Sequence, residues 1–334
     1  MAEQDTHTRI IRSTSHDPWH NLALEEALLQ DVAPNEVILY LWQNEHTVVI
    51  GRNQNAWKEA RWKELEASNG KLARRLSGGG AVYHDLGNLN FTFVMDRPLY
   101  DLHRQLEVIL KGVRSLGIDA EFSGRNDIVA DGRKFSGNAF LWTPDAGLHH
   151  GTVLVNVKME DLGKYLQVSQ DKMQAKGVTS VKSRVVNLTE LNPEITIDKV
   201  AEALQQAFLE VYGGEGEVLS PAEVVSDMTP LYEKFSSWEW RYGRTPKFDV
   251  SYTTRFEWGG VEIGFSLEDG KVAACTLFTD AMDSELFQEI AAYLEQIPFR
   301  EDAIQKKLDE VPVVDDAGKQ VIADLKKFLA EQQI

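Results

Sequence analysis

A run of three glycines directly behind two arginines is the clearest chemical signal in the sequence. The segment Arg74–His84 reads RRLSGGGAVYH. Glycine has no Cβ, so the backbone of Gly78–Gly80 can approach a ligand closely, and consecutive N–H groups in such a loop can surround an anion. Arg75 adds a planar guanidinium that pairs with phosphate or carboxylate through two hydrogen bonds. The segment predicts an anion site, with a flexible hairpin turn as the alternative.

The same segment does not match two common nucleotide-binding loops. It lacks the G-x-x-x-x-G-K-[ST] pattern of a P-loop. Tyr83 stands where the dinucleotide-binding pattern requires its third glycine. An interpretation as a kinase or a dehydrogenase therefore loses its main support.

A second segment places a lysine just after a tight turn. Asp131-Gly132 is typical of a two-residue β-hairpin turn, and Lys134 follows it. Because side chains alternate along a strand, we expect Lys134, Ser136 and Asn138 to share one face. The ammonium of Lys134 could stabilise negative charge that develops on an oxygen bound to phosphorus. A lysine that only meets solvent is the alternative.

Three other residues could carry chemistry but are better explained by structure. His149 and His150 are adjacent, so in a strand they point to opposite faces and make a poor pair of metal ligands. We expect one of them to be packed and the other solvated. Cys275 lies in a strand-like run and is interpreted as a buried structural residue. The sequence has no G-x-S-x-G motif, so a serine-hydrolase triad lacks its usual anchor.

Composition and charge limit the class of protein. The 334 residues suggest about two domains, and 43% apolar with 26% charged residues is ordinary globular usage. The net charge of −17 disfavours a duplex-DNA binder, so we expect no nucleic-acid partner. One cysteine allows neither an intrachain disulfide nor a Cys-based zinc site. No secretory signal and no apolar run of about 20 residues is visible, which predicts a cytoplasmic protein without a membrane partner.

The acidic charge is unevenly distributed. Pro246–Ile334 contains nine basic and eighteen acidic residues, whereas Lys71–Lys134 contains ten basic and eight acidic residues. Lys164–Arg184 holds five basic residues and one acidic residue. An acidic protein that keeps two basic stretches is expected to meet something anionic there, although counts over short windows also fluctuate.

The elements that must position these residues fall into a larger first block and a smaller second one. Asp17 and Pro18 are a typical helix start. In the first block we expect helices at Trp19–Leu29, Trp57–Ser68, Leu102–Leu116 and Val200–Val211, and strands at Val37–Trp42, Thr47–Ile50, Leu89–Met95 and His150–Val157.

The second block begins after a boundary expected at Ser236–Pro246. Beyond it the pattern predicts three strands, near Phe248–Trp258, Val261–Leu267 and Lys271–Phe278, and two helices, roughly Ser284–Gln296 and Gly318–Gln332. Strands in runs with helices between some of them favour an α+β fold over a regular βαβ series.

Taken together, these motifs resemble the lipoate–protein ligase A family, and the resemblance covers essentially the whole chain. The matching segments are Asp17–Ala23, Thr47–Asn55, Arg74–Asn88, Gly124–Ile128, Arg133–Asn138, His149–Thr152, Ala175–Arg184 and Ser236–Trp240, followed by the small C-terminal domain. The resemblance implies a mixed-sheet catalytic domain of the biotin/lipoate ligase type over residues 1–245, with its core at about 33–220, and a small accessory domain over 246–334.

The resemblance also implies a reaction. The carboxylate of lipoate attacks the α-phosphate of ATP, and a lysine of an apo lipoyl domain, in an E2 subunit or an H protein, then attacks the lipoyl-AMP. Lys134 corresponds to the family's catalytic lysine. Magnesium is expected with the nucleotide rather than in a protein site. The implied binding residues are Arg75, Ser77, Gly78, Gly79, Gly80, Ala81, Val82, Tyr83, Asn126, Asp127 and Lys134 itself.

Three alternatives remain beside this interpretation. An octanoyl or lipoyl transferase of the same fold would use a cysteine in the catalytic domain, and Met1–Thr245 contains none. A biotin ligase would carry a Gly-Arg-Gly-Arg-x-Gly loop, which is absent. A non-catalytic lipoyl-domain binder is the third alternative, against which the retention of Arg75 and Lys134 argues.

Lys164–Arg184 is expected to close over the adenylate.

Overall fold

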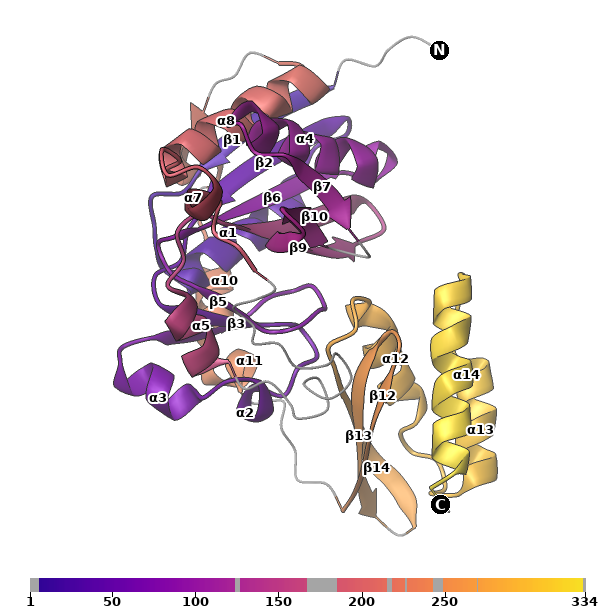
Figure 1. Cartoon of the computed structure of the whole chain (residues 1–334). Helices are drawn as coiled ribbons and strands as arrows, with labels where there is room; N and C mark the ends of the chain where they lie inside the picture. Colours follow the sequence, from indigo (N-terminus) through magenta and orange to yellow (C-terminus); the bar gives the residue numbers. More distant parts are fainter. Residues whose placement is uncertain are drawn as a thin grey trace.

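The computed structural model describes residues 6–123, 127–166, 185–214, 218–225, 227–242, 249–268 and 270–332. Within them, the first block is built on a mixed eight-stranded sheet (Figure 1). Strand β1 pairs in parallel with β2 and β11, and the other neighbours are antiparallel. In spatial order the strands are β11 (Val218–Leu219), β1 (His7–Arg12), β2 (Glu36–Trp42), β6 (Asn88–Asp96), β10 (Ala146–Leu154), β9 (Arg133–Trp142), β8 (Asp127–Ala130) and β7 (Ala120–Ser123).

Helices cover both faces of this sheet. On one face lie α4 (Leu102–Ser115) and α8 (Ile197–Tyr212), over a core that includes Phe91, Phe93 and Phe208. On the other lie α1 (Pro18–Asp31) and α10 (Thr229–Ser236). The polar residues of β6, Asn90 and Thr92, are also buried, and Thr92 donates to Glu25 of α1.

A second, three-stranded sheet carries the glycine segment. Its strands are β4 (Lys71–Arg74), β3 (Thr47–Ile50) and β5 (Val82–His84), with β3 in the middle. Residues 75–81 connect the two outer strands, so both ends of the glycine segment are anchored beside β3.

The single helix expected at Trp57–Ser68 is two helices, α2 (Ala56–Glu59) and α3 (Trp62–Ala67). Between them Ala60 is extended, with φ −126°, and forms a bridge to Leu166. The N–H of Arg61 then donates to the carbonyl of Tyr165, at the end of α5 (Met159–Tyr165). A tertiary pairing that the local sequence does not show thus interrupts a segment of good helix formers.

The C-terminal block has a sheet and a core of its own. Its antiparallel strands are β12 (Val250–Phe256), β13 (Gly259–Glu268) and β14 (Lys271–Thr279). The helices are α12 (Ser284–Tyr293), α13 (Glu301–Glu310), which the sequence pattern did not predict, and α14 (Asp316–Ala330). The α+β fold class is confirmed, with a large mixed sheet and a separate small sheet at the C-terminal end (Figure 1).

The remaining short elements are η1 (Arg97–Leu99), α7 (Leu188–Leu191), α9 (Pro221–Val224) and α11 (Trp238–Arg241). None of the helices in the described part of the chain is both long enough and apolar enough to cross a membrane.

Candidate functional site

A cavity of about 180 Å³ lies between the glycine segment and the face of the large sheet beneath α1. One part of its lining, which we call the floor, is at most 7% exposed and comprises Leu22, Trp42, His84, Asn90 and His150. The other part, the mouth, is partly exposed and comprises Gly80, Ala81, Val82, Lys134, Thr152 and Met282. The cavity thus runs from a buried floor to an accessible mouth.

Arg75 holds the glycine segment in place from inside. Its side chain is buried, and Nη2 donates to the carbonyls of Gly78 and Gly80 at 2.7 and 2.8 Å. Nε donates to Ser77 Oγ at 3.1 Å. Burial lowers the pKa of the guanidinium to about 10, so it stays charged at neutral pH. The sequence predicts that the guanidinium of Arg75 binds an anion. In the structure it donates to carbonyl groups of its own loop instead.

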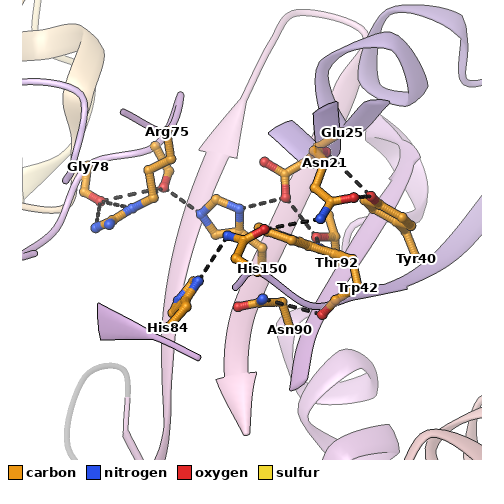
Figure 2. Close-up of polar contacts among 12 residues, drawn as sticks. Asn21, Glu25, Tyr40, Trp42, Arg75, Gly78, His84, Asn90, Thr92 and His150 are labelled. Atoms are coloured by element: carbon orange, nitrogen blue, oxygen red, sulfur yellow. Dashed lines mark hydrogen bonds and ion pairs between the residues drawn. The ribbon is translucent and has the colours of Figure 1, made fainter. Parts of the chain in front are cut away.

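A continuous chain of hydrogen bonds links this loop to α1 (Figure 2). Ser77 Oγ lies 2.6 Å from His150 Nε2, and His150 Nδ1 lies 2.8 Å from Glu25 Oε1. The same carboxylate oxygen accepts from Thr92 Oγ1 at 2.7 Å, and Thr92 accepts from the indole of Trp42. Because Glu25 is fully buried, this chain joins the loop, β10, α1 and β6 in the interior.

The two adjacent histidines point to opposite faces of β10, as expected. His149 contacts Gln105 Oε1 on α4 and Asn138 Oδ1, each at 2.8 Å. The expectation that one of the pair is solvated was wrong, because His149 and His150 are 0% and 6% exposed. Helices cover both faces of the sheet, so neither face of β10 meets solvent at this point.

Lys134 lies at the mouth and forms an ion pair with Asp127. Its Nζ is 2.7 Å from Asp127 Oδ1, and the two side chains are 35% and 40% exposed. Asn126, also predicted to lie near the nucleotide, is outside the described residues. Lys134 and Asp127 are therefore the two predicted charged residues that the structure brings together at the mouth.

The predicted shared face of Lys134, Ser136 and Asn138 was wrong. Ile128 pairs with Ser136 but Val129 pairs with Lys134, so β9 contains one extra residue at Phe135. Such a bulge breaks the period-2 alternation. A Cβ on Gly137 would lie 2.8 Å from Lys134 Nζ, which places Lys134 over Gly137 on the cavity face.

The C-terminal block contacts the glycine segment directly. The N–H of Gly79 donates to the carbonyl of Ala281 at 2.8 Å. A Cβ on Gly78 would lie 2.2 Å from the carbonyl oxygen of Met282, so only glycine fits there. Two further bonds, from Thr279 N to Asn53 O and from Asn53 Nδ2 to Ser284 O, extend this contact. The N–H of Gly79, which the sequence predicts to face an anion, is thus already bonded to a carbonyl of the C-terminal block.

The remaining predicted residues divide between the cavity wall and the packing behind it. Gly79, Gly80, Ala81 and Val82 line the cavity. Tyr83 faces the other way: its ring stacks on Tyr165 with centroids 5.6 Å apart, and its hydroxyl lies 2.9 Å from His46 Nδ1.

Sequence reasoning missed most of the floor. Trp42, His84 and Asn90 were not singled out for a role, nor was Glu25, which bonds the floor from α1, and His150 was interpreted as structural. The available signal was a pair of adjacent glutamates, Glu25-Glu26, inside an otherwise apolar helix, because a buried carboxylate needs a partner.

No group of three or more His, Cys, Asp or Glu side chains that could hold a metal ion occurs within the residues that the structure describes. At the mouth, the carboxylate beside Lys134 is that of Asp127 and is ion-paired. This donor set fits a cation carried by a phosphate ligand rather than one held by the protein alone.

Comparison with known proteins places the chain in a family. Residues 17–209 match the family model of the lipoyl protein ligase A/B catalytic domain, and residues 245–329 match that of the bacterial lipoate protein ligase C-terminus. The structure of LipL1 from P. falciparum in complex with lipoate is 28% identical, with a TM-score of 0.86, covering 97% of this chain and 100% of that one.

Two other solved structures match nearly three quarters of the chain. The bi-partite lipoate protein ligase of Thermoplasma acidophilum, described with its E2 lipoyl domain, is 29% identical, with a TM-score of 0.64, and covers 73% of this chain and 100% of that one. A lipoate-protein ligase A bound with ATP is 27% identical, with a TM-score of 0.62 and coverage of 72% and 100%. The family model spans more than half of the sequence, and the chain belongs to the lipoyl protein ligase A/B catalytic domain family.

Proposed function

We propose that this protein is an ATP-dependent lipoate–protein ligase that forms lipoyl-AMP and transfers the lipoyl group to a lysine of apo lipoyl domains. The observation that carries the proposal is the polarity of the cavity. Its floor includes the apolar side chains of Leu22 and Trp42, and its mouth carries the ammonium of Lys134. A molecule with an apolar tail and a carboxylate head matches that order.

In the first proposed step, a carboxylate oxygen of lipoate attacks the α-phosphorus of ATP, and pyrophosphate leaves. Negative charge develops on the phosphoryl oxygens, and Lys134 is the cation at the mouth that can stabilise it. Arg75 contributes indirectly, because it fixes the carbonyls of the glycine segment and so shapes the wall against which the reactants are aligned. Magnesium, bound to the nucleotide, would neutralise further phosphate charge.

In the second step, the ε-amine of the target lysine attacks the lipoyl carbonyl carbon, an amide bond forms, and AMP leaves. Lys134 can also stabilise the oxyanion of this step from the same position. Its ion pair with Asp127 orients the ammonium. Both steps then use one site.

The partners and the location are parts of the same proposal. Neighbouring structures are described with lipoate, with ATP and with an E2 lipoyl domain, which supports these ligands and this class of partner. E2 subunits and an H protein are the proposed targets, and the proposed location is the cytoplasm, where ATP is available.

A transferase of the same fold is the second candidate, but the cysteine chemistry of such enzymes has little support here. Cys275 is the sole cysteine, lies on β14 and is 6% exposed. Burial raises its pKa, so the reactive thiolate is disfavoured. It is also absent from the lining of the cavity that holds Lys134.

The decisive experiment incubates the enzyme and an apo lipoyl domain with lipoate, with and without ATP, and follows the mass of the lipoyl domain. A lipoyl adduct that requires ATP, together with lipoate-dependent ATP–pyrophosphate exchange, supports the ligase. Transfer from a lipoylated donor without ATP would instead support the transferase. Binding of the lipoyl domain with neither reaction would support the non-catalytic binder.

A further inference from the structure

The floor of the cavity contains one polar atom whose partner is missing. Among the described residues that line the cavity, the sole buried side-chain nitrogen or oxygen without a hydrogen-bond partner is His84 Nε2. His84 is the last residue of β5 and is 3% exposed. Its ring meets Trp42 edge-on, with centroids 6.3 Å apart and an interplanar angle of 72°. Both rings are therefore fixed at the floor.

The surrounding amides determine which nitrogen of His84 carries the proton. Asn21 Oδ1 accepts from Ser13 Oγ and Tyr40 Oη, so its Nδ2 is the donor, and it donates to the carbonyl of Gln43. The same Nδ2 lies within hydrogen-bond distance of the carbonyl of Ser15 and of Asn44 Oδ1, so the oxygen of the Asn44 amide, and not its nitrogen, faces Asn21. The amide nitrogen of Asn44 then donates to His84 Nδ1 at 3.1 Å. Since Nδ1 accepts, the proton of the neutral ring lies on Nε2.

The ring stays neutral in the folded protein. Burial lowers the pKa of His84 to about 3, and the nearby charges of Arg75 and His150 act in the same direction. His84, a residue of the cavity lining, thus carries a neutral and unpartnered N–H donor. His149 and His150 differ, because both ring nitrogens of each are within hydrogen-bond distance of a side chain. Asn90, the other floor amide, bonds the carbonyl of Trp42 and the amide of Asn88.

We propose that His84 Nε2–H recognises a sulfur atom of the dithiolane ring, and that His84 thereby determines the preference for a lipoyl over a plain alkyl acid. The inference rests on the proposed function, since it needs the carboxylate at Lys134 and the tail at the floor. A sulfur is a weak acceptor that can meet the N–H, whereas a methyl or methylene group leaves a buried donor unpaired. A site built around a donor discriminates against the analogue that lacks the acceptor.

The test uses three acids that differ only in the tail. They are lipoate, 5-cyclopentylpentanoate, in which CH₂ groups replace both sulfurs of the ring, and octanoate. We expect the wild type to prefer lipoate over the carbocycle by about tenfold in kcat/KM for pyrophosphate release, the ratio expected for one hydrogen bond. His84→Phe and His84→Leu should reduce that ratio to about twofold or less.

His84→Gln is the matched variant, because its amide can reach the position of Nε2, and it should restore part of the preference. Equal ratios in the wild type and all three variants would overturn the proposal. Calorimetric binding of the same acids keeps this test separate from the reaction. A wild type that forms no adenylate yet binds lipoate more tightly than the carbocycle refutes the proposed function and leaves the role of His84 supported.

A spectroscopic measurement on the wild type removes any dependence on how well the variants fold. In ¹⁵N-labelled protein, long-range ¹H–¹⁵N spectra assign the tautomer of each histidine ring. We expect the Nε2–H signal of His84 to shift on addition of lipoate and to shift far less with 5-cyclopentylpentanoate. A ring protonated on Nδ1, or equal shifts with both acids, would contradict the proposal.

Discussion

The floor and the mouth of the cavity are built in opposite ways. Floor side chains come from regular elements and are buried, and three of them, Trp42, Asn90 and His150, are bonded to α1 or to neighbouring strands. The mouth combines a glycine segment, a lysine on a bulged strand and Met282 of the C-terminal block. A rigid floor suits recognition of one fixed tail. A partly exposed mouth suits a reaction in which a nucleotide and a protein must arrive in turn.

The largest effect on the reaction is expected when Lys134, the cation at the mouth, is removed. Lys134→Ala should reduce lipoate-dependent ATP–pyrophosphate exchange by about 10²–10³-fold, the usual cost of losing one donor to a developing oxyanion. Lipoate affinity, measured by calorimetry, should fall by less than about tenfold, because the floor still holds the tail and a partly exposed ion pair with the carboxylate is weak. Lys111→Ala, at an exposed lysine of α4 paired with Glu107, is the control. Full exchange activity in Lys134→Ala would remove this residue from the mechanism.

A substitution in the hydrogen-bond chain behind the floor should lower the stability of the protein as well as the reaction rate. Glu25→Ala leaves His150 Nδ1 and Thr92 Oγ1 without their common partner, and we expect a loss of about 3 kcal/mol in the free energy of unfolding, measured with urea. Glu25→Gln should lose less, because it keeps an acceptor. The exposed Glu64→Ala should stay within about 0.5 kcal/mol of the wild type. A stable Glu25→Ala would show that the buried chain does not hold the floor together.

Gly78 and Gly80 allow a paired test of the contact between the loop and the C-terminal block. Gly78→Ala would place a methyl group 2.2 Å from Met282 O, whereas nothing lies within 4 Å of a Cβ on Gly80. We expect Gly78→Ala to cost about 2 kcal/mol and to increase hydrogen exchange at the amide of Thr279, which bonds Asn53 O. Gly80→Ala should leave that amide protected. Equal exchange in the two variants would mean that the contact does not depend on Gly78.

Two buried histidines, His84 at the floor and His149 on the opposite face of β10, should make the stability depend on pH. Burial lowers the pKa of both His84 and His149 to about 3, against about 6.5 in the unfolded chain. Below pH 6.5 the unfolded state takes up these protons and the folded state does not, so the free energy of unfolding falls as the pH falls from 6.5 toward 3. The expected slope is about one proton, roughly 1.4 kcal/mol per pH unit, for each histidine.

Urea titrations at several pH values measure this slope. His149→Gln should reduce it by about one proton, and the exposed His103→Gln should leave it unchanged. An unaltered slope in His149→Gln would show that this histidine does not titrate as its burial implies.

Local signals predicted the elements well wherever neighbours in sequence decide the conformation. Asp17 does cap α1, accepting from Trp19 N, and Pro18 is its first residue. Asp131 and Gly132 adopt φ values of 52° and 67°, as a tight hairpin turn requires. β3 has the bounds expected of it, Thr47–Ile50.

Two of the misses depend on how one segment pairs with another. The pairing of Ala60 with Leu166 splits a helix, and the bulge at Phe135 turns Lys134 to the other face. The floor unites α1, β2, β5, β6 and β10, which lie far apart along the chain. The glycine segment and Lys134 could be singled out because they are concentrated local motifs, whereas a single His or Trp in a strand carries no such mark.

The burial of Cys275 has a consequence for the chemistry of the proposed substrate. A five-membered cyclic disulfide is open to attack by a thiolate, which would leave a mixed disulfide on the enzyme. Here the one thiol is 6% exposed, has a raised pKa and does not line the cavity. The protein can therefore hold an oxidised dithiolane without entering thiol–disulfide exchange with it, and the ring can be delivered in the redox state in which it arrived.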